Sequence, residues 1–270
     1  MKTINPSELS PMQVQMILQT AVAPRPIALA STIDKNGNVN LSPFSFFNLF
    51  SSNPPILIFS PARRVRDNST KDTLHNVLEV PEVVIGNVNF DMVQQVSLSS
   101  TEYETGVDEF IKSGLTKNPA ELVKPPLIAE SPVNFECKVI EVKPLGNEGG
   151  AGNLVICEVL KIHIREEFLN EEGNLDQKKL DLVSRLGGNW YGRTSAETLF
   201  EVPKPLVTKG IGFDQLPSEI KNSKVFTRND LGMLANVEQL PEGNISADEN
   251  LHLEAQKLLL EGKIEEAWKV

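Results

Sequence analysis

The chain has 270 residues, of which 40% are hydrophobic, and 26 Lys and Arg stand against 36 Asp and Glu, a formal net charge of −10. This composition predicts a globular protein with a sizeable core, and the negative charge argues against nucleic acid or an anionic membrane surface as a partner. Two cysteines are too few for a disulfide scaffold. With no apolar leader and no apolar run of membrane-spanning length, we expect a cytoplasmic protein with free thiols.

Up to about residue 200, Pro and Gly separate short apolar runs of strand length. The runs that predict strands are 24–33, 39–42, 56–60, 82–88, 133–145 and 152–166. Helices are expected over 11–20 and 71–79, the second with Ser69 or Thr70 as N-cap, and residues 90–123 combine helical and loop spacing. Asn36-Gly37 predicts a hairpin. Five or six mostly antiparallel strands with inserted helices favour a closed or partly open barrel over a doubly wound sheet.

A basic loop precedes the second predicted helix. Arg63, Arg64 and Arg66 lie within four positions of an otherwise acidic chain and lead to a helix start at Lys71. Arginine binds phosphate with two parallel hydrogen bonds, and free N–H groups at a helix start favour an anion. The loop therefore indicates a phosphate site. The alternative is a solvated loop whose arginines pair with surface carboxylates.

Two aromatic segments are further candidates. SPFSFFN at 42–48 could present backbone N–H groups beside an aromatic wall, as a flat heteroaromatic ring requires, or it could form a Phe-rich corner of the core. GGNWYGR at 187–193 could form a ligand lid or a subunit contact, or a surface loop with its aromatics tucked inward. Three scattered histidines and two cysteines in apolar strands provide no evident catalytic set. That pattern suits chemistry carried by a bound cofactor.

Four segments in this order, PRPIALASTIDKNGNVNLSPFSFFN, NPPILIFS, KDTLHNV and RLGGNWYGR, resemble the flavin reductase-like family over about residues 20–200. The resemblance implies a mainly β fold with helices, namely a six-stranded antiparallel FMN-binding split β-barrel. It also implies a homodimer with FMN near the dimer interface, and NAD(P)H as the reductant of the flavin in many members.

The resemblance also assigns cofactor-binding positions. Arg25 corresponds to the arginine of the PRP segment near the site, and Tyr191 resembles a residue that approaches the flavin from the same or the partner subunit. The remaining positions comprise a strand-end pair beside the flavin, a turn that meets the isoalloxazine edge, and a region for ribityl and phosphate: Ser31 and Thr32; Ser45, Phe46 and Asn48; Ser60, Arg63, Lys71, Asp72 and Thr73.

Residues 1–200 are thus predicted to form the split barrel, and 201–270 a helical C-terminal extension. In the extension, Asn229 or Asp230 is a plausible N-cap, Ser246 to Glu249 fits a capping box, and Gly262 is a probable break between two helices. We expect this extension to pack against the barrel or the dimer partner; the alternative is recruitment of a third protein.

Three functional hypotheses follow. The first is an FMN-dependent oxidoreductase that transfers hydride from NAD(P)H to flavin and electrons onward to a small-molecule or protein acceptor. The second is an FMN-binding electron carrier without NAD(P)H activity of its own. The third is a non-catalytic interaction protein without flavin affinity. No metal and no single catalytic side chain is predicted.

Overall fold

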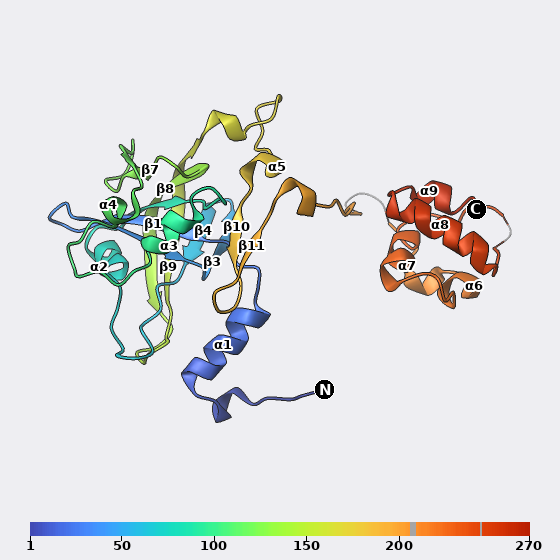
Figure 1. Cartoon of the computed structure of the whole chain (residues 1–270), viewed down its shortest axis with the longest axis horizontal. Coiled ribbons are helices and arrows are strands. Elements are labelled where there is room, and N and C mark those ends of the chain that lie inside the picture. Colours follow the sequence, from blue (N-terminus) through green and yellow to red (C-terminus); the bar gives the residue numbers. More distant parts are fainter. Residues whose placement is uncertain (206–208, 244) are drawn as a thin grey trace. The chain divides into compact units, whose positions relative to one another are not determined.

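The computed structural model describes residues 1–205, 209–243 and 245–270 (Figure 1). The chain divides into two compact units, Met1–Leu199 and Phe200–Val270. Residues 206–208 and 244, within the predicted C-terminal extension, lie outside the described residues. Among the described helices, none combines the length and the apolar character that crossing a membrane requires.

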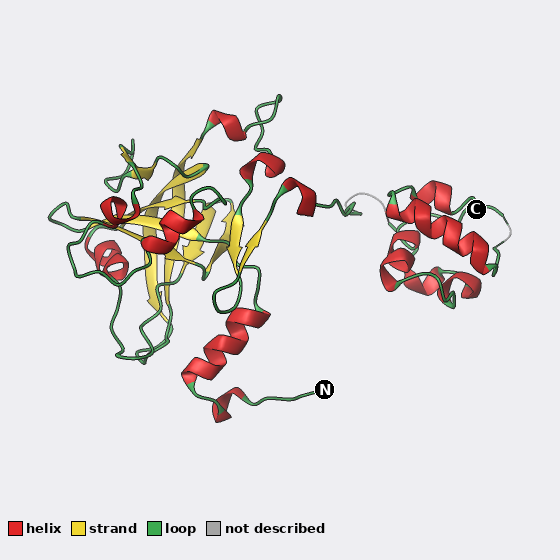
Figure 2. Ribbon diagram, in the orientation of Figure 1, coloured by secondary structure: helices red, strands yellow, loops and turns green. Residues whose placement is uncertain are grey.

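An antiparallel sheet of seven strands dominates the first unit (Figure 2). The six-strand prediction is therefore wrong by one strand, Phe47–Ser52, which lies in the Phe-rich segment between prolines and forms an edge of the sheet by pairing with Pro55–Phe59. The sheet order is β2-β1-β5-β8-β9-β4-β3. The strands are β1 Ala28–Ile33, β2 Val39–Phe44, β3 Phe47–Ser52, β4 Pro55–Phe59, β5 Glu82–Gly86, β8 Val133–Pro144 and β9 Asn153–Ile164.

The two edges of this sheet are consecutive in the chain. Only Ser45 and Phe46 separate edge strand β2 from edge strand β3. Seven flat strands would hold their edges about 29 Å apart at ~4.8 Å per strand, whereas a two-residue link spans about 10 Å. The sheet must therefore roll up. No ladder joins β2 to β3 among the described residues, so the barrel stays split at this seam rather than closed.

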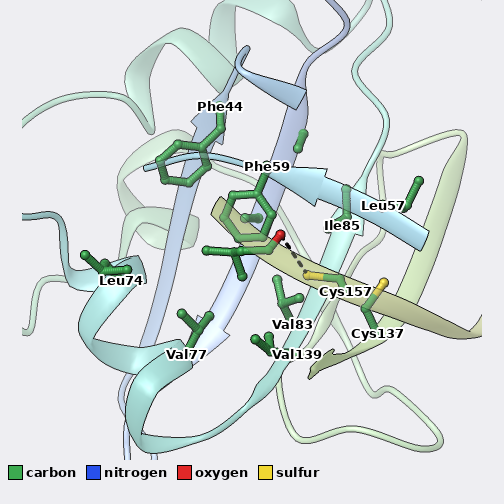
Figure 3. Packing of buried hydrophobic residues seen from close by; sticks show 13 residues of the cluster. Phe44, Leu57, Phe59, Leu74, Val77, Val83, Ile85, Cys137, Val139 and Cys157 are labelled. Carbon is green, nitrogen blue, oxygen red and sulfur yellow. Dashed lines mark hydrogen bonds between the residues drawn. The ribbon is translucent and has the colours of Figure 1, made fainter. Parts of the chain in front are cut away.

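The barrel interior is apolar, and helix α2, Asp72–Glu79, packs onto it. Leu74 and Val77 of this helix join Phe44 and Phe59 in one buried cluster (Figure 3). Burying two such side chains stabilises the fold by about 3–6 kcal/mol. Cys137 and Cys157 lie in the same cluster as free cysteines, as small buried hydrophobes. Burial raises the pKa of the Cys137 thiol to about 12, which makes it unreactive.

A second buried cluster covers the opposite face of β1, β2 and β5, under helices α3, Val93–Leu98, and α4, Glu109–Ser113. Glu136 of β8 anchors residues 121–123, which precede this strand in the chain. Its carboxylate accepts hydrogen bonds from the backbone N–H groups of Glu121, Leu122 and Val123 and lies 2.5 Å from His163 Nε2. The short strands β6, Lys117–Asn118, and β7, Leu127–Ile128, pair with each other.

The N-terminal helix and a small hairpin complete the first unit. Helix α1, Pro11–Ala21, starts with a capping box formed by Ser10 and Gln13, and none of its residues is buried. Strands β10, Val183–Arg185, and β11, Tyr191–Arg193, pair where the sequence predicted a loop. Short helical segments are η1 Pro6–Glu8, η2 Glu166–Phe168, α5 Gln177–Leu180 and η3 Ala196–Thr198.

The second unit is helical, with a core of its own. Its elements are η4 Phe213–Gln215, α6 Ser218–Lys221, α7 Arg228–Leu234, α8 Glu249–Leu260 and α9 Ile264–Ala267. The predicted N-caps are shifted: Thr227 caps α7 in a capping box that uses Asp230 as its third residue, and Asp248 caps α8. Gly262, at φ 76°, separates α8 from α9 as predicted.

Candidate functional site

Lys71 stands at the N-terminus of α2 as a half-buried cation. Its Nζ donates to Ser42 Oγ at 3.0 Å and lies 5.1 Å from the centre of the Phe44 ring. No carboxylate forms an ion pair with it within the described part of the chain. Burial, and then the charge of Arg64, hold the pKa of Lys71 below its usual value, with the carboxylates of Glu102 and Glu109 opposing. An anion at this point would compensate the Lys71 ammonium group for the hydration that it loses on burial.

The start of α2 differs from the prediction, because Lys71 is the N-cap residue and no side chain caps the helix. The predicted caps are engaged elsewhere. Ser69 Oγ accepts from Arg64 Nη1 at 2.8 Å and donates to Asp67, and Thr70 Oγ1 lies 2.6 Å from His75 Nε2. The first N–H groups of this eight-residue helix are therefore left without side-chain acceptors, which leaves them available to an anion.

A buried polar network holds α2 against the barrel. Asn40 Nδ2 donates to Thr73 Oγ1 at 2.8 Å, and Asn76 Nδ2 donates to Thr32 Oγ1 at 3.1 Å. Thr32 and Thr73 are fully buried here, so their side chains position the helix. Ser31, the neighbour of Thr32, points to the opposite face of β1 because strand side chains alternate. Its buried Oγ has no hydrogen-bond partner among the described residues.

The basic loop between β4 and α2 is shaped by its own arginines. Arg63 donates through Nε to Asn68 Oδ1 at 2.6 Å, and its backbone N–H donates to the Ala151 carbonyl at 2.8 Å. Arg64 Nε and Arg66 Nη2 share the carboxylate of Glu102, at 3.0 and 2.6 Å. Arg64 and Arg66 pair with surface carboxylates, as the solvated-loop alternative expects, and the phosphate site stays a prediction.

A cleft of about 890 Å³ separates this loop from the N-terminal segment. Its volume suits a drug-sized or nucleotide-sized ligand. We call it the arginine cleft. Its lining comes from the N-terminal segment (Pro6, Ser7, Leu9, Pro11, Met12, Val14, Gln15 and Leu18), from Phe46, from the basic loop (Ala62 to Arg66), and from Glu102, Gly149 and Gly150.

Arg25 links three segments around the site. Its guanidinium donates to the carbonyls of Gln19 and Val22 at the end of α1 and to the carbonyl of Leu186, and Nε lies 3.4 Å from Ser45 Oγ. Burial, and then the charge of Arg185, lower the pKa of Arg25. With these donors occupied, the side chain braces the β2–β3 turn.

Three further predicted residues are Phe46, Asn48 and Asp72. The Phe46 carbonyl accepts from the Ser60 backbone N–H at 2.8 Å, which joins the β2–β3 turn to the basic loop, and the Phe46 side chain lines the arginine cleft. Asn48, two residues beyond Phe46, is exposed on β3. Asp72 accepts from Thr105 Oγ1 at 3.4 Å in the first turn of α2.

Tyr191 lies apart from the arginine cleft. It stacks under the guanidinium of Arg185, with 4.5 Å between the Arg185 Cζ and the ring centre, and lines a separate pocket of about 190 Å³ with Phe90 and Arg193. Sequence reasoning did not find Glu102, the acid that organises the arginines, because nothing in its polar surroundings at 99–106 marks it.

A sequence profile of the flavin reductase like domain matches residues 21–181. The chain belongs to this family. Among curated relatives, this flavin reductase-like chain is 38% identical over 208 residues to an uncharacterized protein of Halalkalibacterium halodurans, a match that covers 76% of this chain and 98% of the relative.

Solved structures agree with that assignment. Component B of nitrilotriacetate monooxygenase from Bacillus cereus is 27% identical with a TM-score of 0.68, over 76% of this chain and 98% of that one. A Shewanella frigidimarina protein with a split barrel domain, 23% identical, has a TM-score of 0.62 over 73% of this chain and 95% of that one. The latter likeness concerns the fold, and the first unit of this flavin reductase-like chain is accordingly a split barrel.

Proposed function

We propose that this protein is an FMN-binding oxidoreductase of the flavin reductase type, which takes hydride from NAD(P)H and delivers electrons to a further acceptor. The observation that supports it is Lys71: a half-buried ammonium group without a carboxylate partner among the described residues, at an uncapped helix start. A terminal phosphate would supply the missing negative charge.

The residues around Lys71 fit FMN. The phosphate would lie between the Lys71 ammonium group and the N–H groups at the start of α2 that no side chain caps. The ring edge would meet the turn formed by Ser45 and Phe46, which Arg25 braces. When bound, FMN supplies the redox chemistry, as it accepts a hydride and releases electrons in one or two steps. The protein binds, orients and shields it.

The structure also supports a homodimer, which we include in the proposal. Leu49 and Phe50 on edge strand β3 are exposed, as are three residues of β9, Leu160, Ile162 and Ile164. Exposed apolar side chains on strands are a feature that contact between subunits would cover. A sedimentation mass near 29.8 kDa, that of one chain, would contradict the dimer. The free cysteines suit a reducing cytoplasm.

The first experiment adds FMN to the full-length protein and then NADH or NADPH without oxygen, while the flavin absorbance is recorded. Bleaching supports the proposal. Bound flavin that dithionite reduces but neither nucleotide reduces would favour the electron-carrier hypothesis instead. Absence of FMN binding would overturn the proposal and leave the interaction-protein hypothesis.

The matched pair of variants is Lys71→Glu and Lys257→Glu. Lys257 is an exposed residue of α8 in the helical unit. We expect Lys71→Glu to weaken FMN binding at least ~10-fold, because a charge-assisted bond becomes a repulsion, and Lys257→Glu to leave it unchanged. Equal dissociation constants for the two variants would remove Lys71 from the site.

A further inference from the structure

The arginine cleft has two chemically different walls. The basic loop contributes Arg63, Arg64 and Arg66 to the lining, and the N-terminal segment contributes apolar residues, with Phe46 also in the lining. We propose that this cleft binds the 2′-phosphoadenosine end of NADPH, so that the protein uses NADPH in preference to NADH. This inference rests on the proposed function, because it assigns the electron donor of the same flavin site.

The cationic wall retains binding capacity for a dianion. Arg64, Arg66 and Arg63 face two carboxylates, Glu102 and Asp67, which leaves one positive charge in excess in a chain of net charge −10. Glu102 fixes the two guanidinium groups on either side of its own carboxylate, while the Arg66 side chain remains 68% exposed. A guanidinium group has five N–H donors. When two or three of them hold the loop together, the others stay available to a phosphate.

The apolar wall suits a flat base. Leu9, Pro11, Val14 and Leu18 recur on one side of the N-terminal segment and line the cleft. Helix α1 buries none of its residues, and Leu18 is 54% exposed, so this surface has no cover of its own. An isolated helix of this length is marginal in water without such cover. An adenine ring supplies an apolar face, which a bare phosphate would not.

The position of the cleft also fits an electron donor. Phe46 belongs both to the turn expected to meet the flavin ring and to the lining of the cleft, and Arg64 belongs to the cleft and acts on Lys71. A dinucleotide with its adenosine end here would therefore lie beside the flavin. The apolar wall, residues 6–18, precedes residues 21–181 that the family profile matches.

The test uses adenosine 2′,5′-bisphosphate and 5′-AMP as probes, titrated calorimetrically into the full-length FMN-loaded protein. The two differ in the phosphate on the 2′-oxygen. We expect the bisphosphate to bind at least ~10-fold tighter, because each charge-assisted bond contributes about that factor. In Arg66→Gln this advantage should fall to less than ~3-fold. Equal affinity of the two probes for the unmodified protein would overturn the inference.

The matched control is Arg165→Gln, an arginine that pairs with the neighbouring Glu167 and does not line the cleft. It should keep the full preference. A second variant, Gln15→Glu, adds a negative charge to the exposed apolar wall and should weaken the bisphosphate more than 5′-AMP. If Arg66→Gln and Arg165→Gln lose the preference alike, the cleft is not the site.

Kinetics separate this inference from the proposed function. We expect the kcat/KM ratio of NADPH to NADH to exceed ~10 in the unmodified protein and to fall in Arg66→Gln through a higher KM for NADPH, with the FMN dissociation constant unchanged. Flavin reduction with equal or greater efficiency by NADH would overturn the NADPH assignment and leave the oxidoreductase intact. Bisphosphate binding without reduction by either nucleotide would support the nucleotide site and overturn the oxidoreductase.

Discussion

Glu136 and Lys71 are two charged side chains beside the same barrel, and the fold compensates only one of them. Glu136 is 0% exposed and receives three backbone N–H groups and a histidine. Burial raises its pKa, but these hydrogen bonds outweigh it, and the net pKa lies below the usual value. Within the described part of the chain, Lys71 contacts one hydroxyl and one ring face, and burial leaves its pKa below the usual value.

The difference separates structure from function. A buried charge that the chain itself satisfies, such as Glu136, stabilises a local arrangement, in this case the segment 121–123. A charge that is buried without a partner lowers the stability of the fold. Such a charge is retained where a ligand provides the missing partner. By this criterion Glu136 is structural, and we propose that Lys71 belongs to a binding site. Four substitutions and conditions sharpen or break the comparison.

The largest effect is expected for Glu136→Gln. The amide cannot accept from all four donors, so at least one backbone N–H group remains buried and unpaired, at a cost of about 2–4 kcal/mol in the free energy of unfolding. Urea denaturation measures it, with Glu141→Gln, an exposed position of β8, as the control. A loss equal to that of the control would show that Glu136 is dispensable.

Lys71→Met should show the opposite pattern. FMN should bind about 10–100-fold more weakly, because a charge-assisted contact to the phosphate is lost. The free energy of unfolding without FMN should change by less than about 1 kcal/mol, because the fold already disfavours the ammonium group. Fluorescence titration and urea denaturation of the same sample test both parts. A clear loss of stability with unchanged FMN affinity would place Lys71 with Glu136.

Arg25→Lys tests a charge of intermediate type, a buried cation satisfied by carbonyls. A lysine ammonium group cannot bond all the carbonyls that the forked guanidinium group reaches. Helix α1 should therefore detach more often from the barrel, and the free energy of this opening should fall by about 1–2 kcal/mol. Hydrogen exchange of the α1 amides measures this opening, and Arg165→Lys serves as control. Unchanged exchange in α1 would exclude the bracing role.

The smallest effect is the pH dependence. Because the pKa of folded Glu136 is below its usual value of 4.5, its contribution to stability is present above that pH and is lost as the pH falls through the folded value. The difference in unfolding free energy between the unmodified protein and Glu136→Gln should therefore be constant at neutral pH and narrow as the pH falls through the folded pKa. A difference that is independent of pH contradicts the ionised state.

The sequence predicted the features that depend on local patterns. The Asn36-Gly37 hairpin, the long β8–β9 pair and helix α2 lie where propensity and periodicity placed them. It missed features that depend on distant partners. Ser69 could not cap α2 because Arg64 occupies it, and strand β3 forms because β4 offers an edge. In the sequence, Glu136 between Phe135 and Cys137 fits the ordinary alternation of a strand. Its four hydrogen-bond partners come from residues 121–123 and from His163, so the pattern around Glu136 did not indicate them.

The turn between β8 and β9 has a consequence for the arginine cleft. A Cβ on Gly149 would lie 3.0 Å from the carbonyl oxygens of both Arg64 and Val65. Any residue other than glycine at position 149 would push the arginine loop outward. A substitution in the β8–β9 turn therefore also changes the position of the loop at Arg64 and Val65, although the two segments are far apart in the chain. A variant that replaces this glycine should therefore have a cleft of altered width.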